Sequence, residues 1–181
     1  MPQRSSRSDL RLVTLAKKPF WRCLPQAFLS TVLEAGPSFT QERRYSVRGE
    51  FSALYFSASK ELCLKEVWGR TGPDGEVMAC VEFEVTVDRL VDLTDQETRR
   101  RVRAQLDDLI RPRLSRHAYA TPQRVARRIY REGFPGLLAP SVHDPRGERE
   151  DGFSLVLYPA NLIRSSVRQV RVEEVVSTLP R

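Results

Sequence analysis

Residues 43–68 read RRYSVRGEFSALYFSASKELCLKEVW, and the rest of the chain is organised around this stretch. Gly49 permits a backbone turn, and residues 53–56 form a short apolar run that is typical of a buried strand. A helix follows, which either Ser57 or Ser59 can cap. The stretch therefore predicts a compact turn, strand and helix unit.

Three residues of this unit together suit one kind of substrate. Arg44, Tyr55 and Glu66 follow one another at intervals of eleven residues and supply a guanidinium, a flat ring and a carboxylate. These groups suit a charged substrate that carries planar rings. Glu66 also lies four residues after Leu62, on or beside the apolar face of the expected helix. Because burying an unpaired carboxylate costs on the order of several kcal/mol, Glu66 is predicted to be paired or functional.

Length and composition favour one ordinary folded domain. The chain has 181 residues, 40% of them apolar and 29% charged, and no run approaches the roughly 18 apolar residues of a membrane span. Residues 1–15 are expected to form a basic N-terminal tail and residues 16–176 the domain. No secretory signal follows the basic start. We therefore expect a soluble protein with no membrane partner.

The pattern of cysteines indicates the cellular compartment. Cys23, Cys63 and Cys80 show no CxxC or Cys/His ligand spacing, and each has apolar neighbours. We expect reduced thiols in the core and a cytoplasmic location.

The net charge of +7 suggests an acidic or phosphate-bearing partner, although a basic surface can also serve solubility alone. Much of the excess lies in residues 99–103 and 124–131, within expected helices, where arginines are typical of solvated faces. A nucleic-acid-binding module without catalysis is the alternative. Because no aromatic residues are interleaved with these arginines, direct binding of nucleic acid is not favoured.

Several strands are predicted around the central unit. Residues 77–87 alternate apolar and polar side chains, which is the cleanest strand pattern in the chain. The other predicted strands cover residues 20–23, 136–141, 153–158 and 167–176. Residues 70–76 are expected to form a turn, and residues 144–152 a charged loop.

Two further helices are predicted from their ends. Thr94 and Glu97 have the spacing of a capping box that opens a helix through about residue 109, with Pro112 as its stop. Thr121 is expected to cap the next helix, with proline in its first turn, and Gly133 to end it.

Several familiar catalytic patterns are absent from the sequence. It has no P-loop, no GxGxxG and no HExxH, and neither His117 nor His143 belongs to a metal-ligand cluster, so we expect no metal site. Ser141 ends a predicted strand without a GxSxG elbow. His143 shares a strand face with Ser141 at a spacing of two, where side chains do not usually touch.

Short segments in a fixed order resemble the RES domain. They lie at residues 21–22 (WR), 44–46 (RYS, followed by Gly49), 53–59 (ALYFSAS), 64–66 (LKE), 92–94 (DLT), 133–141 (GFPGLLAPS) and 154–158 (SLVLY). The family is named for its arginine, glutamate and serine, and many of its members are toxins of bacterial toxin–antitoxin pairs. The resemblance covers roughly residues 20–160.

The resemblance implies an α+β domain similar to ADP-ribosyltransferases, with a mixed, strongly bent β-sheet and helices around it. It implies NAD+ as the substrate, with no further cofactor, and cleavage of the nicotinamide–ribose bond by hydrolysis or phosphorolysis. Transfer of ADP-ribose to a protein target is the alternative. It also implies an Xre-like antitoxin that blocks the active site, and leaves homodimerisation open.

Site residues follow from the same resemblance. Glu66, Arg44 and Ser141 match the catalytic pattern, and the substrate-binding set is Arg44, Tyr55, Arg22, Tyr45 and Ser141. Bond cleavage develops an oxocarbenium ion, which a fixed carboxylate such as Glu66 would stabilise. Arg44 would hold the pyrophosphate and Tyr55 would stack on nicotinamide.

Two positions depart from the pattern. Ser46 and Ser154 stand where many relatives have asparagine. Losing both amides would alter loop bonding or ribose contacts. The alternative to an active enzyme is therefore a protein with reduced activity, or an inactive relative of the family that serves as a binding protein.

Overall fold

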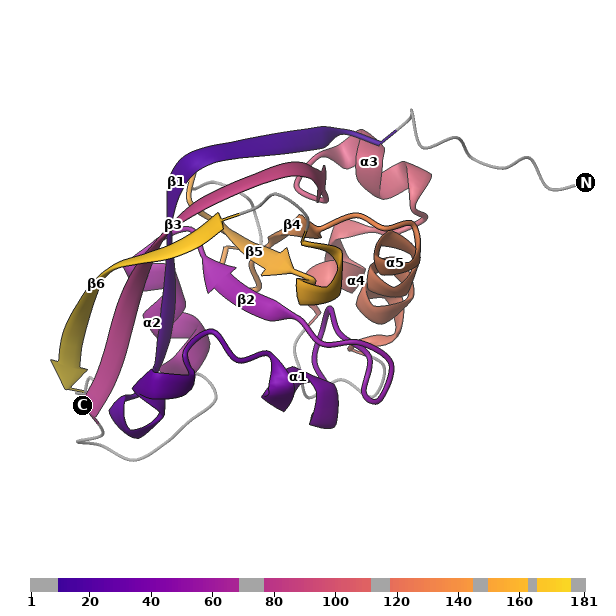
Figure 1. Cartoon of the computed structure of the whole chain (residues 1–181). Coiled ribbons are helices and arrows are strands. Elements are labelled where there is room, and N and C mark those ends of the chain that lie inside the picture. Colours follow the sequence, from indigo (N-terminus) through magenta and orange to yellow (C-terminus); the bar gives the residue numbers. More distant parts are fainter. Residues whose placement is uncertain (1–9, 69–76, 112–117, 145–149, 163–165, 177–181) are drawn as a thin grey trace, which may run out of the picture.

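The computed structural model describes residues 10–68, 77–111, 118–144, 150–162 and 166–176. Two long antiparallel strands, β1 (Leu12–Pro25) and β3 (Val77–Asp92), pair along most of their length and form the spine of the domain (Figure 1). In β3, Val81, Phe83 and Val85 are fully buried while the residues between them are half-buried, as the alternation predicted. The predicted strands at 20–23 and 77–87 are confirmed, and both are longer than expected.

The start of β1 changes one expectation. Residues 12–15, assigned above to the N-terminal tail, lie in the sheet, where Leu12 is the partner of Val91. Residues 1–9 lie outside the described residues.

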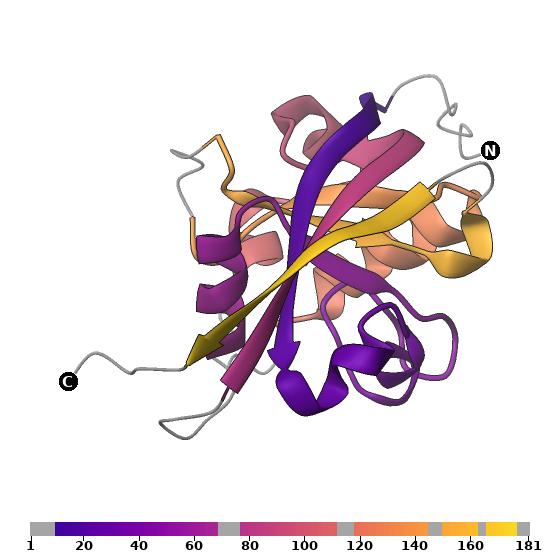
Figure 2. The same cartoon turned by 60° about the vertical axis from the view of Figure 1, so that its left-hand side comes forward.

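The sheet is mixed and bends back on itself. Its order is β1, β2 (Leu54–Ser57), β5 (Phe153–Leu157), β4 (Gly136–Pro140), β3 and β6 (Ser166–Val176). Because β1 also pairs with β3, five strands form a closed circuit, and β6 lies outside it along β3. Among the strand pairings of the described residues, the short β3–β4 pairing alone is parallel. Figure 2 shows β1, β3 and β6 crossing together over one side of the molecule. The expected bent, mixed sheet is confirmed.

Three apolar clusters hold the layers together. The first lies within the strand circuit and includes Phe20, Phe56 and Phe83. The second joins the sheet to α4 (Leu106–Ile110) and α5 (Ala120–Arg131). The third lies between α2 (Lys60–Trp68) and the β1–β3 ribbon. Thus α2 covers one end of the long strands, and α3 (Gln96–Arg101), α4 and α5 gather at the opposite end (Figure 1). None of the helices in the described part is long and apolar enough to cross a membrane.

Short helical turns connect these parts. Two of them follow β1, namely η2 (Gln26–Thr31) and α1 (Gly36–Thr40), and η3 (Pro159–Asn161) follows β5. Gly49 has a positive φ of 74°, which fits the turn predicted before β2.

The helix predicted over residues 94–109 is wrong in its start and its length. Asp95, not Thr94, is the N-cap, because its carboxylate accepts the Thr98 N–H at 2.7 Å. Thr94 instead donates its hydroxyl to Asp92. The helix, α3 (Gln96–Arg101), ends early because Arg103 adopts a left-handed φ of 54°, and α4 starts separately.

The end of α5 was predicted better than its start. Gly133 follows the helix with a positive φ of 77°, as expected of a residue after a C-cap. Thr121 lies inside the first turn, and the N-cap is Tyr119, which makes no side-chain cap bond. Pro112, the turn at 70–76 and most of the loop at 144–152 lie outside the described residues.

Candidate functional site

A cavity of about 520 Å³ lies where α2 faces the ends of β2, β4 and β5. Its wall includes residues from β1, from the segment around α1, from α2 and from the end of α4. This volume is within the range of small-molecule and cofactor sites.

Glu66 lies in the wall of this cavity, and three serine hydroxyls donate to its carboxylate. Ser57 bonds Oε2 at 3.1 Å, while Ser141 and Ser154 bond Oε1 at 3.1 and 2.9 Å. Each serine comes from a different neighbouring strand or strand end: β2, β4 and β5. Ser57 and Ser154 are direct partners across the β2–β5 pair. The sheet therefore fixes both oxygens of a carboxylate that α2 supplies.

Ser141 is buried and committed to this network. Its backbone N–H donates to the Gly152 carbonyl at 3.0 Å, and its hydroxyl oxygen accepts the backbone N–H of His143 at 3.2 Å while donating to Glu66. The contact of His143 with Ser141 thus runs through the backbone. The Ser141 hydroxyl is thus shared between the Glu66 carboxylate and the His143 backbone N–H.

Two tyrosines form an aromatic part of the wall. The Tyr55 hydroxyl accepts the Tyr45 backbone N–H at 3.1 Å and donates to the Ser46 hydroxyl at 3.3 Å. Ser46 is fully buried and donates in turn to the Ser38 carbonyl at 3.1 Å. Burial raises the pKa of Tyr45, so its phenol stays neutral. The hydroxyl of Ser46 therefore helps to hold Tyr55 in place.

Arg44 lines the cavity, yet two of its donors are used within the fold. Its terminal nitrogens bond the carbonyls of Leu109 and Arg111 at 2.7 and 2.8 Å, and its guanidinium lies 5.3 Å from the ring centre of Tyr119. These bonds tie the C-terminal end of α4, whose last carbonyls lack helical partners, to the site.

Arg22 differs from Arg44 in this respect. Its Nη1 is buried and has no hydrogen-bond partner among the residues that the structure describes. Burial, and to a smaller extent the charge of nearby Arg43, lowers the pKa of Arg22. A buried guanidinium nitrogen without a partner beside a cavity is a candidate for binding an anion.

The family follows from a sequence comparison. A family model described as the RES domain matches residues 19–176. The chain belongs to the RES domain family. Among curated proteins, the sequence comparison finds no match.

Solved structures agree on the fold of this RES domain. It superposes on a chain of the crystal structure of the MbcT–MbcA toxin–antitoxin complex of M. tuberculosis with a TM-score of 0.71. The two are 16% identical, and the match covers 90% of this chain and 87% of that chain. The two chains therefore share a fold.

The residues named from the sequence meet in one place. The structure brings all six of them to the wall of the same RES domain cavity: Arg22, Arg44, Tyr45, Tyr55, Glu66 and Ser141. Their catalytic and binding roles remain predictions.

Two partners of Glu66 were not predicted. Ser57 was expected only as a helix cap, but Ser59 has that role, since its hydroxyl accepts the Leu62 N–H at 3.3 Å. Ser154 was noted only as a departure from the family pattern, although it makes the shortest of the three bonds to Glu66. The strand alternation around both serines was the available signal, because it places them on one face.

The arginines of the helices do not form a free basic surface. Arg99 donates to the carbonyls of Leu93 and Thr94, and Arg100 and Arg101 pair with Glu97. In α5, the arginines likewise have intramolecular partners, at positions 124, 127, 128 and 131. Most of the arginines in residues 99–103 and 124–131 therefore also make contacts within the helical end of the fold.

Proposed function

We propose that this RES domain cleaves the nicotinamide–ribose bond of NAD+ as substrate, with water or phosphate as the acceptor. The observation that carries the proposal is the carboxylate of Glu66, held by three serine hydroxyls in the wall of a cavity of about 520 Å³. An enzyme that breaks a glycosidic bond needs such a fixed carboxylate beside the ribose.

The chemistry assigns Glu66 the central role. As the bond to the nicotinamide nitrogen lengthens, positive charge grows on the ribose while the leaving pyridinium becomes neutral. A carboxylate that is already oriented stabilises this charge without reorganising. It can also bond a ribose hydroxyl and orient the attacking water or phosphate. The serines contribute by fixing the carboxylate, because three donors leave it few other orientations.

Other residues of the wall suit the rest of the substrate. Arg22 has a buried guanidinium nitrogen to offer to the pyrophosphate, and Arg44 adds a second positive charge. The ring of Tyr55, held through its hydroxyl, provides a flat surface for nicotinamide.

We also propose that the enzyme acts as a toxin that a cognate antitoxin protein, Xre-like as in the family, neutralises by covering the cavity. The similar solved structure is a toxin–antitoxin complex. Beside the cavity, η2 and α1 with the turn between them expose three large apolar side chains: Phe28, Leu33 and Phe39, at 58, 42 and 43%. Glu34, Pro37 and Ser38 of the same segment line the cavity. A partner that buries the apolar residues would also close the entrance.

The first experiment follows nicotinamide release from NAD+ by the purified protein, with and without phosphate. Glu66→Gln keeps the shape of the side chain and should lower kcat by about 10²- to 10³-fold with little change in KM, as when one stabilising group is removed from a transition state. Glu61→Gln, on the exposed face of the same helix, is the matched control and should release nicotinamide at the wild-type rate.

The products identify the acceptor. Dependence of the rate on phosphate indicates phosphorolysis, and release without phosphate indicates hydrolysis. Labelled ADP-ribose on a protein of an added extract would instead support the transferase alternative. If folded wild-type protein releases no nicotinamide under any of these conditions, the proposal is wrong.

Toxicity has a separate test. Expression of the wild-type chain alone should arrest bacterial growth and deplete cellular NAD+, whereas Glu66→Gln should be tolerated. Equal toxicity of the two forms would contradict a toxin that acts by NAD+ cleavage.

A further inference from the structure

The three cysteines of the chain converge from three different elements. Cys23 lies on β1, Cys63 on α2 and Cys80 on β3, and all three are buried, free thiols. Together with Trp21 and Leu64 they form one apolar cluster beneath α2. None of the roles given above to the cavity uses these sulfurs.

Cys23 is the common neighbour of the other two. It faces Cys80 directly across the β1–β3 pair, a relation that brings Cα atoms within the distance a disulfide requires. Its backbone N–H donates to the Cys63 sulfur at 3.0 Å. Cys63 also donates to the carbonyl of Trp21 at 3.5 Å. Cys23 therefore lies next to both of the other cysteines.

The three cysteines differ in their position relative to the cavity. Cys23 and Cys63 line the cavity, whereas Cys80 lies behind them and is completely buried. In the part of the chain that the structure describes, no cluster of histidine, cysteine, aspartate or glutamate has an arrangement that could hold a metal ion. The geometry therefore favours thiol oxidation over metal binding.

We propose that this cluster is an oxidative modification site, in which a peroxide that enters the cavity oxidises Cys63 and Cys23 then joins it in a disulfide. Cys63 is the entry point because it lines the cavity and its sulfur accepts the Cys23 N–H at 3.0 Å.

The chemistry balances in two steps. The Cys63 sulfur attacks hydrogen peroxide, the O–O bond breaks, and the products are a sulfenic acid on Cys63 and one water. The Cys23 sulfur then attacks the oxidised sulfur, the S–O bond breaks, and the Cys23 proton passes through Cys80 to the departing hydroxide, which leaves as a second water. Two thiols are oxidised and one peroxide is reduced.

Cys80 supplies the base for the second step. The hydrogen bond from Cys23 lowers the pKa of Cys80, with help from the charge of Lys60, while the hydrogen bonds to Cys63 and Cys80 raise the pKa of Cys23. Cys80 also faces Cys23 directly across the β1–β3 pair, so it is placed to take the Cys23 proton as the new S–S bond forms. The carboxylate of Glu173, which pairs with Lys60, acts in the opposite direction on the pKa of Cys80.

The disulfide would fasten α2 to β1. Cys63 lies one helical turn before Glu66, so the link would immobilise the element that carries the carboxylate. The modification itself does not depend on the proposed NAD+ cleavage.

The test is peptide mapping of the wild-type protein after treatment with hydrogen peroxide. Trypsin places each cysteine in its own peptide, 23–43, 61–65 and 71–89. The proposal expects the first two to be cross-linked, the third to remain free, and the thiol count under denaturing conditions to fall from three to one. A cross-link between 23–43 and 71–89, a sulfinic acid without a cross-link, or three free thiols would each overturn it.

Two cysteine variants test the roles proposed for Cys23 and Cys80. Cys23→Ser should leave an unresolved sulfenic acid on Cys63, which a diketone reagent traps. Cys80→Ser should still form the disulfide, but at least several-fold more slowly at neutral pH. An unchanged rate in Cys80→Ser would overturn its role as the base. The wild-type map decides the proposal even if a variant fails to fold.

Discussion

Arginines gather in two regions of this RES domain, and the regions differ in what the guanidinium groups contact. At the helical end, Arg124 donates to the carbonyls of Val102 and Arg103 at 3.0 and 2.6 Å, and Arg127 forms a two-bond pair with Glu50. At the cavity, Arg22 keeps a buried nitrogen with no partner in the described residues. The same side chain therefore stabilises the fold in one region and is available for a ligand in the other.

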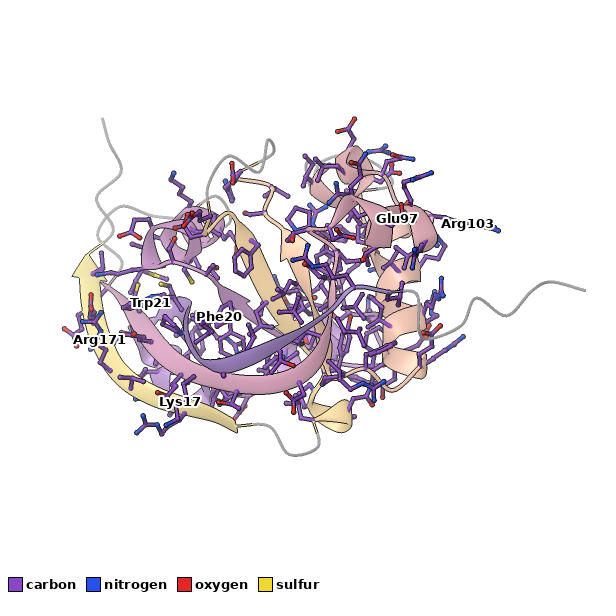
Figure 3. The ribbon with its side chains drawn as sticks, turned by 90° about the horizontal axis from the view of Figure 1, so that it is seen from above. Lys17, Phe20, Trp21, Glu97, Arg103 and Arg171 are labelled. Atoms are coloured by element: carbon purple, nitrogen blue, oxygen red, sulfur yellow. The ribbon has the colours of Figure 1, made fainter. Side chains whose placement is uncertain are left out.

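The two regions are well separated. Figure 3 shows Glu97 and Arg103 at one end of the molecule and Trp21, next to Arg22 in sequence, toward the other. Because their partners differ, substitutions in the two regions should change different quantities: unfolding free energy at the helical end, and substrate affinity at the cavity.

Among the arginines of the two regions, the largest effect is expected for Arg22→Met. Losing charge-assisted bonds of about 2–3 kcal/mol to a pyrophosphate should raise KM for NAD+ by about 30- to 150-fold. The free energy of unfolding should stay the same or increase, because a buried, partly desolvated cation is replaced by an apolar chain. Nicotinamide release kinetics and urea unfolding measure the two quantities.

Arg127→Met is the matched control for Arg22. Its pair with Glu50 is partly exposed, so its removal should change neither KM nor kcat. If both substitutions raise KM equally, the distinction between the two regions fails.

Arg124→Met should lower the stability of the fold and leave the kinetics unchanged, the reverse of Arg22→Met. It leaves two carbonyls after α3 without their donor, so the free energy of unfolding should fall by about 2 kcal/mol. KM and kcat at a temperature where the variant is folded should match the wild type. Thermal or urea unfolding beside the kinetic assay provides the measurement, and an altered KM with full stability would contradict it.

The sequence predicted the strands better than the helices for a physical reason. In β3, the alternation of Val81, Phe83 and Val85 with polar residues is itself the burial pattern of the strand. The predicted 94–109 helix is divided for two other reasons. Asp95 rather than Thr94 provides the N-cap, and Arg103 adopts a left-handed backbone conformation. Neither outcome can be read from local preference.

For the site, the sequence supplied residue types and the fold supplied partners. Glu66 was predicted to be paired or functional from its place on the helix, but its serine partners at 141 and 154 are 75 and 88 residues away. Likewise, the carbonyls that hold Arg44 lie 65 and 67 residues further along the chain. Such long-range contacts have no signal in spacing.

Ser154→Ala tests whether the serines matter to the carboxylate. The substitution leaves Oε1 of Glu66 with Ser141 as its hydroxyl donor, so kcat should fall by about 10-fold, the equivalent of roughly 1.4 kcal/mol. KM should change less, because Glu66 acts mainly in the transition state. The exposed Ser30 of η2 gives the control Ser30→Ala. A kcat equal to wild type would show that two serines suffice.

The smallest effect belongs to the helical end, at Asp95. The Thr98 backbone N–H lowers the pKa of this carboxylate, with further help from Arg11, so the cap stabilises the fold above the ordinary pKa of aspartate, roughly 3.9. This stabilisation is lost as the pH falls through the lowered value. Asp95→Ala should therefore reduce the unfolding free energy by about 1 kcal/mol at neutral pH.

The difference between Asp95→Ala and wild type should shrink as the pH drops below roughly 4, where the wild-type cap becomes protonated. Urea unfolding of both proteins across this range measures it. A difference that stays constant with pH would mean that the charge contributes nothing and that the cap acts only as a neutral acceptor. Nicotinamide release at neutral pH should be unchanged, because neither Asp95 nor Thr98 lines the cavity. A slower reaction in the folded variant would show that α3 and the cavity are coupled, and the two regions would then have to be treated as one.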